Sequence, residues 1–368
     1  MANFAAARYR GLRPSPMMRM AALAAGVEGC IDLTLGEPDV PTPRDICGKL
    51  AEAAYAGETH YAAGMGLPGL REAVAAYWNG RYGLGFRPDE VLVTTGGSQA
   101  CFLTMQACLD PGDEVLILEP FFTFYEAHVK QAGGVPVFCM SGADDDFLPD
   151  PDAIEKKITP RTKALIVNSP CNPTGAVLSR GILEGLARLA AKYDLLVVSD
   201  ELYEAFVYEG EHIPFASLPG MKERTVTIGG MSKSYAMTGW RLGYAMGDQE
   251  LLRTMQVIGV VQTVCPSTMV QRASEYALRS CDGEIKEITE LFRRRVACAC
   301  EAFSALPGIK TVRPRGSFYL FIDVSGTGLN QYVLILAATG VGKEAAADGI
   351  GRVMSLAQQS VHAAGEFR

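Results

Sequence analysis

The chain has 368 residues, of which 48% are apolar and 20% are charged, and its formal net charge is -7. A chain of this length buries a large core and predicts two domains, or one large domain with an appendage. This composition argues against intrinsic disorder, and an acidic balance without a basic run argues against a nucleic-acid partner.

The ten cysteines form no Cys-x-x-Cys pair and no ladder with metal-ligand spacing. We therefore expect reduced thiols, no bound metal and a cytoplasmic, reducing location. The apolar stretch MRMAALAAGV near the N-terminus is too short and too arginine-flanked for the core of a signal peptide. No apolar run approaches the ~20 residues of a membrane span, so no membrane partner is expected.

From about residue 67, amphipathic stretches alternate with short apolar runs. Apolar residues spaced three and four apart predict helices over 70–78, 99–109 and 180–193. The continuous apolar runs predict strands covered on both faces, at 91–94, 114–118, 163–167, 194–199 and 225–228. Repeated β-α order of this kind predicts a layered α/β domain with a largely parallel sheet.

The last ninety residues follow a different pattern. A long amphipathic helix is predicted over 284–303, followed by strands at 310–314 and 317–324 of a smaller α+β unit. The first forty-five residues lack the β-α rhythm, and we expect them to wrap onto that unit. The predicted large domain is therefore 46–274, and the predicted small domain combines 1–45 with 275–368.

Chemically active residues follow the ends of the predicted strands, where open α/β sheets bind their ligands. Glycines and free N-H groups in TGGSQA, at 94–100, would suit a phosphate dianion, although an ordinary strand-to-helix turn explains them equally well. Asn172 lies in NSPCNPTG, which a Pro-Asn turn also explains. Asp200 ends a buried strand, and a carboxylate there needs a cation or a strong donor.

Lys233 lies between two serines in IGGMSKSYAMTGWRLGY, at 228–244, and the next charged residue is Arg241. Together, the turns offer an amine with few charged neighbours, a phosphate cradle with a guanidinium, and a carboxylate suited to a heteroaromatic nitrogen. Tyr203 and Asn172 are both suited to reach a ring oxygen. These are the requirements of pyridoxal phosphate (PLP), held by Lys233 as a Schiff base with the ring as electron sink.

Seven motifs resemble, in order and spacing, the class I/II aminotransferases of PLP fold type I, and the resemblance runs from about residue 10 to about residue 323. Such proteins have a large domain with a mostly parallel mixed sheet between helices, and a small α+β domain. The motifs are GEPD at 36–39, HYAAGMGLPGLREA at 60–73, TTGGSQA at 94–100, EPFFTFY at 119–125, NSPCNPTGAV at 168–177, SDELYEAFVY at 199–208 and MSKSYAMTGWRLGY at 231–244.

The resemblance implies that Lys233 anchors PLP and then moves the proton between the substrate α-carbon and C4′ of the cofactor. Asp200 would pair with the pyridine nitrogen, and Tyr203 and Asn172 would hydrogen-bond the ring oxygen. Phe122 matches the aromatic residue that stacks on the ring, with Phe121 and Tyr125 as competitors that are more often core.

The same resemblance implies a phosphate site made by the backbone of Gly97, Ser98 and Gln99 with Ser232 and Arg241. Tyr61 matches a tyrosine that reaches the phosphate of the neighbouring subunit, which implies a homodimer with shared active sites. Gly36 matches a position whose backbone lies against the substrate carboxylate.

The sequence departs from the family pattern in two places. Gly230 stands where some relatives carry a phosphate-binding serine. The segment after residue 330 lacks the expected Pro-Gly-Phe-Gly loop and is about twenty residues short, which leaves Arg352 as the candidate to grip the substrate carboxylate. The lesser candidates are Arg13, Arg313 and Arg315.

The function implied is an aminotransferase that moves an amino group between an amino acid and a 2-oxo acid by a ping-pong mechanism. Carbon-sulfur β-lyases and cyclopropane-forming synthases share the architecture and stay open as alternatives, as does a catalytically impaired or effector-binding homologue. The substrate is not fixed by the sequence. FFTFY and PMMRM favour an apolar or aromatic amino acid, although both stretches are more often core.

Overall fold

The computed structural model describes residues 22–24, 26–27, 36–327 and 335–337. Their main feature is a seven-stranded sheet in the order β1-β7-β6-β5-β4-β2-β3. Neighbouring strands pair in parallel, except that β7 lies antiparallel between β1 and β6. The strands are β1 Val91–Thr94, β2 Glu114–Glu119, β3 Val135–Met140, β4 Thr162–Asn168, β5 Leu196–Asp200, β6 Thr225–Gly230 and β7 Gly243–Met246.

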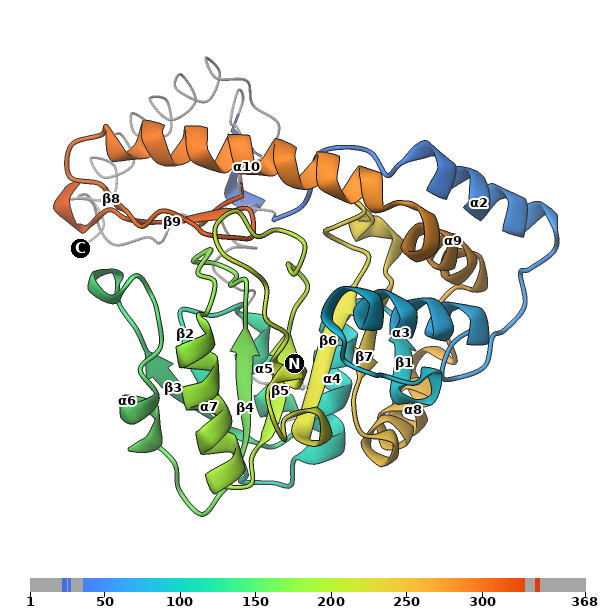
Figure 1. Ribbon diagram of the computed structural model, residues 1–368, viewed down its shortest axis with the longest axis horizontal. Helices are drawn as coiled ribbons and strands as arrows, with labels where there is room; N and C mark the ends of the chain where they lie inside the picture. Colours follow the sequence, from blue (N-terminus) through green and yellow to red (C-terminus); the bar gives the residue numbers. More distant parts are fainter. Residues whose placement is uncertain (1–21, 25, 28–35, 328–334, 338–368) are drawn as a thin grey trace, which may run out of the picture.

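Alternate residues of the strands face opposite helical layers, as the pleat requires. In β4, Ala164 and Ile166 pack toward one layer, whereas Leu165 and Val167 pack toward the other. Figure 1 shows α7 and α3 in front of the sheet and α4 and α5 behind it. The helices around the sheet are α2 Arg44–Tyr55, α3 Pro68–Tyr82, α4 Gly97–Cys108, α5 Phe124–Gln131, α6 Pro151–Glu155, α7 Arg180–Lys192, α8 Gln249–Thr263 and α9 Thr268–Ser280.

A second sheet of three antiparallel strands, in the order β10-β9-β8, lies with the long helix α10 above the main sheet (Figure 1). Phe292 of α10 packs on Phe318 beside β9 and on Phe206 from the turn after β5. This aromatic contact joins the upper unit to the end of β5. The elements are α10 Asp282–Ser304, β8 Lys310–Thr311, β9 Tyr319–Asp323 and β10 Ile335–Ala337.

Short 3₁₀ turns connect several of these elements. They are η2 Pro88–Glu90, η3 Ala143–Asp145, η4 Phe215–Ser217, η5 Lys222–Arg224, η6 Thr238–Trp240 and η7 Ser325–Thr327. None of the helices in the described ranges is long and apolar enough to cross a membrane.

The predicted α/β class is confirmed, and each predicted strand and helix corresponds to an observed element. Two strands of the main sheet were not predicted. β3 begins exposed and contains Pro136, which is tolerated because this strand lies at the sheet edge. β7 is four residues long and begins inside the lysine motif, so its GYAM sequence carried no separate signal. The division into domains at 46–274 stays a prediction.

Gly243 sets how closely β7 approaches the start of α4. A Cβ at this position would lie 2.5 Å from the backbone N of Gly97 and 2.6 Å from the carbonyl carbon of Gly96. Those are backbone atoms, which cannot move without disturbing the strand or the helix. The first turn of α4 is therefore held against the sheet at the point where β1 ends.

Candidate active site

A cavity of about 350 Å³ opens at the carboxyl ends of the parallel strands. Its wall is assembled from the turns that follow β1, β2, β4, β5 and β6, together with the chain at Gly36 and at Tyr319 of β9. Most of the site residues predicted from the sequence line it, namely Gly36, Gly97, Ser98, Phe122, Asn172, Asp200, Tyr203, Ser232, Lys233 and Arg241.

Lys233 follows β6 and is partly buried. Its Nζ donates a hydrogen bond to the carbonyl oxygen of Gly36 at 2.6 Å. Withdrawal from water lowers the pKa of Lys233 to about 8, with Glu37 opposing this effect, Arg241 adding to it, and Asp200 opposing it weakly. The amine is therefore neutral for an appreciable fraction of the time near neutral pH, as a nucleophile or base must be.

Asp200 is the last residue of β5 and is buried. The Tyr125 hydroxyl donates to its Oδ2 at 2.5 Å, and the amide of Leu202 donates to its Oδ1 at 3.3 Å. Burial raises the pKa of Asp200 above its ordinary value, whereas the hydrogen bonds from Tyr125 and Leu202 lower it. The two hydrogen bonds thus favour the ionised form of Asp200, whereas burial favours the protonated form.

Asn172, Tyr203 and Tyr319 bring their polar ends together. The Tyr203 and Tyr319 hydroxyls are 2.7 Å apart, and the Asn172 Nδ2 donates to Tyr319 at 3.2 Å and to Tyr203 at 3.5 Å. Asn168 ends β4 and positions this group, because its Oδ1 accepts from the Asn172 amide at 2.7 Å and its Nδ2 donates to the Asp200 carbonyl at 2.8 Å.

The start of α4 forms an anion site beside Arg241. The helix begins at Gly97 after Gly96, whose φ is 86°, and no side chain caps it. Arg241 donates from Nη1 to the Thr238 carbonyl at 2.7 Å, and a Cβ on Gly96 would lie 2.6 Å from its Nη2. An uncapped helix N-terminus against a guanidinium suits a phosphate, and Ser98 lines the same wall.

Other predicted residues lie away from the cavity or outside the described chain. The Gln99 side chain accepts from the Thr95 amide at 2.7 Å and donates to Gln262 of α8 at 3.2 Å, so only its backbone remains for the predicted role. Tyr61 is 82% exposed. Arg313 pairs with Glu209 at 3.2 Å. Arg352 and Arg13 lie outside the described residues.

Three residues of the cavity wall make contacts that the sequence did not predict. Tyr125 was expected to be core, yet its hydroxyl binds Asp200. Tyr319 was assigned only to a strand, yet it joins the polar group at Asn172. Glu37 accepts a hydrogen bond from the Thr238 hydroxyl at 2.8 Å, which fastens the chain at 36–37 to the loop that carries Lys233.

Phe122, which was predicted to stack on the cofactor ring, lies edge-on to Tyr125, with ring centroids 5.6 Å apart.

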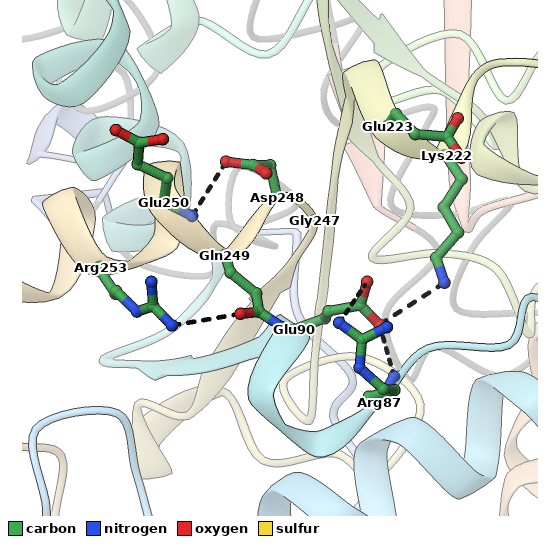
Figure 2. Close-up of a pocket in the computed structure, with 9 residues that line it drawn as sticks. All are labelled: Arg87, Glu90, Lys222, Glu223, Gly247, Asp248, Gln249, Glu250 and Arg253. Carbon is green, nitrogen blue, oxygen red and sulfur yellow. Dashed lines mark hydrogen bonds and ion pairs between the residues drawn. The ribbon is translucent and has the colours of Figure 1, made fainter.

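A second cavity, of about 450 Å³, lies at the opposite edge of the sheet, where β1 begins and β7 ends (Figure 2). Three of its charged groups pair with one another, since Glu90 binds Arg87 and Lys222, and Asp248 caps α8. Arg253 donates to Gln249 at 3.2 Å. None of the site residues predicted from the sequence lines this cavity, so the cavity at Lys233 is the candidate active site.

Comparisons with known proteins agree with this geometry. The model of the family "Aminotransferase class I and II" matches residues 28–359. An aspartate/prephenate aminotransferase of Thermus thermophilus is 43% identical over 328 residues, covering 86% of this chain and 84% of the relative. An aromatic-amino-acid aminotransferase of Thermococcus litoralis is 38% identical over 328 residues, covering 88% and 84%.

Among solved structures, the aspartate aminotransferase from Thermus thermophilus with maleate superposes with a TM-score of 0.90 at 36% identity, covering 96% of this chain and 99% of that one. The chain therefore belongs to the class I and II aminotransferases. It is an enzyme of that family that uses pyridoxal phosphate and transfers an amino group from an amino acid to a 2-oxo acid.

The cavity fits this cofactor on its own chemistry. It offers an amine with a lowered pKa, a buried carboxylate, two hydroxyls with an amide, and an uncapped helix N-terminus beside an arginine. These groups suit, in turn, an aldehyde, a ring nitrogen, a ring oxygen and a phosphate.

We expect Tyr125→Phe to lower the free energy of unfolding of the cofactor-free protein by about 1–3 kcal/mol at pH 7, because the buried Asp200 carboxylate loses its closest donor. The loss raises the pKa of Asp200 further, so the deficit applies while the carboxyl is charged and shrinks as the pH falls through that pKa. Urea denaturation at several pH values measures both effects.

The matched control is Tyr235→Phe, since among the described residues the buried Tyr235 hydroxyl has no hydrogen-bond partner. We expect this control to keep the parent stability at every pH. A Tyr125→Phe deficit that does not change with pH would contradict the assignment of the effect to Asp200.

Proposed function

We propose that this aminotransferase works by a ping-pong mechanism in which Lys233 is both the anchor of the cofactor and the base. One amino acid leaves as a 2-oxo acid before a second 2-oxo acid enters. The observation that supports this most strongly is the Lys233 amine, whose pKa is lowered to about 8 inside the cavity that also contains Asp200. The match to aminotransferases over most of the chain favours this reaction over β-elimination or ring formation.

Bound pyridoxal phosphate supplies an aldehyde that condenses with an amine and a ring that takes up the electron pair left when the substrate α-carbon loses its proton. With the cofactor bound, Lys233 would supply the neutral amine for that aldehyde and would serve as the base that moves the proton of the substrate α-carbon. Its hydrogen bond to the Gly36 carbonyl, at 2.6 Å, holds Nζ at the substrate side of the cavity before loading.

Asp200 would hold the pyridine nitrogen protonated, and the hydrogen bond from Tyr125 favours the charged carboxylate that this role needs. Tyr203 and Asn172 would donate to the ring oxygen, and Phe122 would pack against the ring. The phosphate is bound by the backbone of Gly97, Ser98 and Gln99 with Ser232 and Arg241. Gly36 and Arg352 bind the substrate carboxylate.

The side chain of the substrate is apolar or aromatic. Six aromatic side chains line the cavity, and Lys233 and Arg241 are the cations among the described lining residues. Both cations are committed to the cofactor, so neither remains for a second substrate carboxylate. The aromatic lining residues are Phe121, Phe122, Phe124, Tyr125, Tyr203 and Tyr319.

The active form is a homodimer in which Tyr61 reaches the phosphate of the partner subunit. The side chain of Tyr61 is 82% exposed. The residues that follow Tyr61 lie against helix α8, because a Cβ added at Gly64 would contact the side chain of Gln256 in that helix. Val257 and Val261, which are 62% and 86% exposed, lie one turn apart on the same face of that helix. A second copy of this chain would cover this apolar surface and bring Tyr61 to the neighbouring site.

The location is cytoplasmic and reducing. The thiols of Cys101, Cys139 and Cys281 are buried and unpaired, and burial raises the pKa of each of them. They therefore resist oxidation and behave as core residues.

Cofactor-free protein mixed with pyridoxal phosphate and quenched with borohydride should carry a stable adduct on Lys233. The initial rate of attachment should rise with pH with a midpoint near 8, because the ammonium cannot attack and the lowered pKa frees the amine earlier than the ordinary 10.5. Lys233→Ala should give no adduct, whereas Lys222→Ala should match the parent. An adduct on another side chain, or a midpoint near 10.5, would contradict the assignment.

Loaded protein given single amino acids without an oxo acid should release at most one equivalent of 2-oxo acid per site. We expect phenylalanine, tyrosine, leucine or methionine to react at least about tenfold faster than aspartate, since the lining residues present aromatic surface and no free cation. Stopped-flow absorbance follows the half-reaction. Faster reaction of aspartate would sink the substrate assignment, and continued release of pyruvate and ammonia would indicate a lyase.

Val261→Glu should convert the dimer to monomer, because it buries an unpaired charge in the proposed interface. Met140→Glu, on the exposed edge strand β3, is the matched control and should stay dimeric. Light scattering at micromolar protein measures both. A monomeric parent protein that turns over normally would disprove the shared site.

A further inference from the structure

Tyr319 is a buried residue of β9 whose hydroxyl lies among groups from three other parts of the chain. The Tyr203 hydroxyl is 2.7 Å away, the Asn172 Nδ2 is 3.2 Å away, and the Gly36 carbonyl oxygen is 3.5 Å away. Tyr319 thus contacts both residues proposed to bind the ring oxygen of the cofactor.

The count of protons decides the direction of these hydrogen bonds. A hydroxyl has one proton to donate, so Tyr203 cannot donate both to Tyr319 and to a bound ring oxygen. If Tyr203 serves the ring oxygen, the proton between the two tyrosines must belong to Tyr319. Asn172 favours this direction, because its amide donates to Tyr319 and therefore makes Tyr319 an acceptor there.

The competing acceptor for the Tyr319 proton is the Gly36 carbonyl, and it is the poorer choice. It lies at 3.5 Å, at the limit of a hydrogen bond, and it already accepts from the Lys233 amine at 2.6 Å. The proton of Tyr319 therefore goes to Tyr203.

We propose that Tyr319 is a positioning residue that donates to Tyr203 and accepts from Asn172, which reserves the Tyr203 proton and the second Asn172 amide proton for the ring oxygen of pyridoxal phosphate. This inference rests on the proposed function of Tyr203 and Asn172. Hydrogen bonds in such a chain polarise one another, so Tyr319 also strengthens the donation by Tyr203.

The Tyr319 ring is held in place from several sides. It stacks on Phe318 with ring centroids 5.1 Å apart and meets Tyr203 edge-on at 5.6 Å. Gly36 supplies the remaining room, because a Cβ there would overlap the Tyr319 hydroxyl. The lack of a side chain at Gly36 is thus explained by Tyr319.

Tyr319→Phe tests the proposal through the pH titration of the absorbance of the lysine-bound cofactor. Donors to the ring oxygen favour its anionic form, so losing one should move the titration midpoint to higher pH, by about 0.5–1 unit. The dissociation constant of the cofactor should also rise a few-fold. Gly36→Ala keeps the hydroxyl but displaces it, and it should shift the midpoint in the same direction.

Tyr203→Phe should give a larger upward shift, and the double variant should shift no further than Tyr203→Phe alone, since Tyr319 acts through Tyr203. The control is Tyr208→Phe, because the buried Tyr208 hydroxyl has no hydrogen-bond partner in the described part of the chain. It should leave the midpoint unchanged.

The outcomes distinguish the proposed role of Tyr319 from the proposed role of Tyr203. Additive shifts, or no shift in Tyr319→Phe while Tyr203→Phe shifts, would overturn the positioning role of Tyr319 and leave the proposed function standing. No shift in Tyr203→Phe would overturn the proposed role of Tyr203, and with it the inference about Tyr319.

Discussion

The withdrawal of the Lys233 amine from water is the constraint on which the rest of the site depends. An ammonium that is only partly solvated favours its neutral form, and this lowers the pKa to about 8. The protein opposes that effect only in part, through the charges of Glu37 and Asp200. Strand geometry supplies the burial, because the carboxyl ends of β4, β5 and β6 bring Asp200 and Lys233 to one edge of the sheet.

Much of this arrangement follows from short-range sequence patterns. Continuous apolar runs identify strands covered on both faces, and the residue after each run lies at the ligand edge, which is how Asp200 and Lys233 were found. Contacts between distant residues leave no such pattern. The Tyr125 hydroxyl meets a carboxylate 75 positions later, and Tyr319 meets a hydroxyl 116 positions earlier, so each looks like an ordinary core aromatic in its own segment. Gln99 shows the converse, because its motif predicts the phosphate turn while its side chain is used to close the loop at Thr95.

The segment before α2 is fastened by three contacts with two other parts of the chain, the loop that carries Lys233 and helix α10. Glu37 accepts from the Thr238 hydroxyl at 2.8 Å, and Asp39 accepts from Arg295 of α10 at 2.5 Å. The Thr42 hydroxyl donates to the Ala236 carbonyl at 2.7 Å. Two of these contacts fall in the loop that carries Lys233, so the position of Gly36 is tied to the position of the amine that it binds.

Two tyrosines support opposite ends of the proposed cofactor site by the same physical means. Tyr125 donates to the carboxylate of Asp200, and so stabilises its negative charge directly. Tyr319 is proposed to donate to Tyr203, and so to support the hydrogen bond from Tyr203 to the anionic ring oxygen. Burial raises the pKa of both phenols well above the ordinary value, so each keeps its proton across the pH range in which Lys233 titrates. A histidine in either place would lose or gain a proton within that range. Phenol donors therefore let the amine of Lys233 change its charge while the hydrogen bonds around it stay the same.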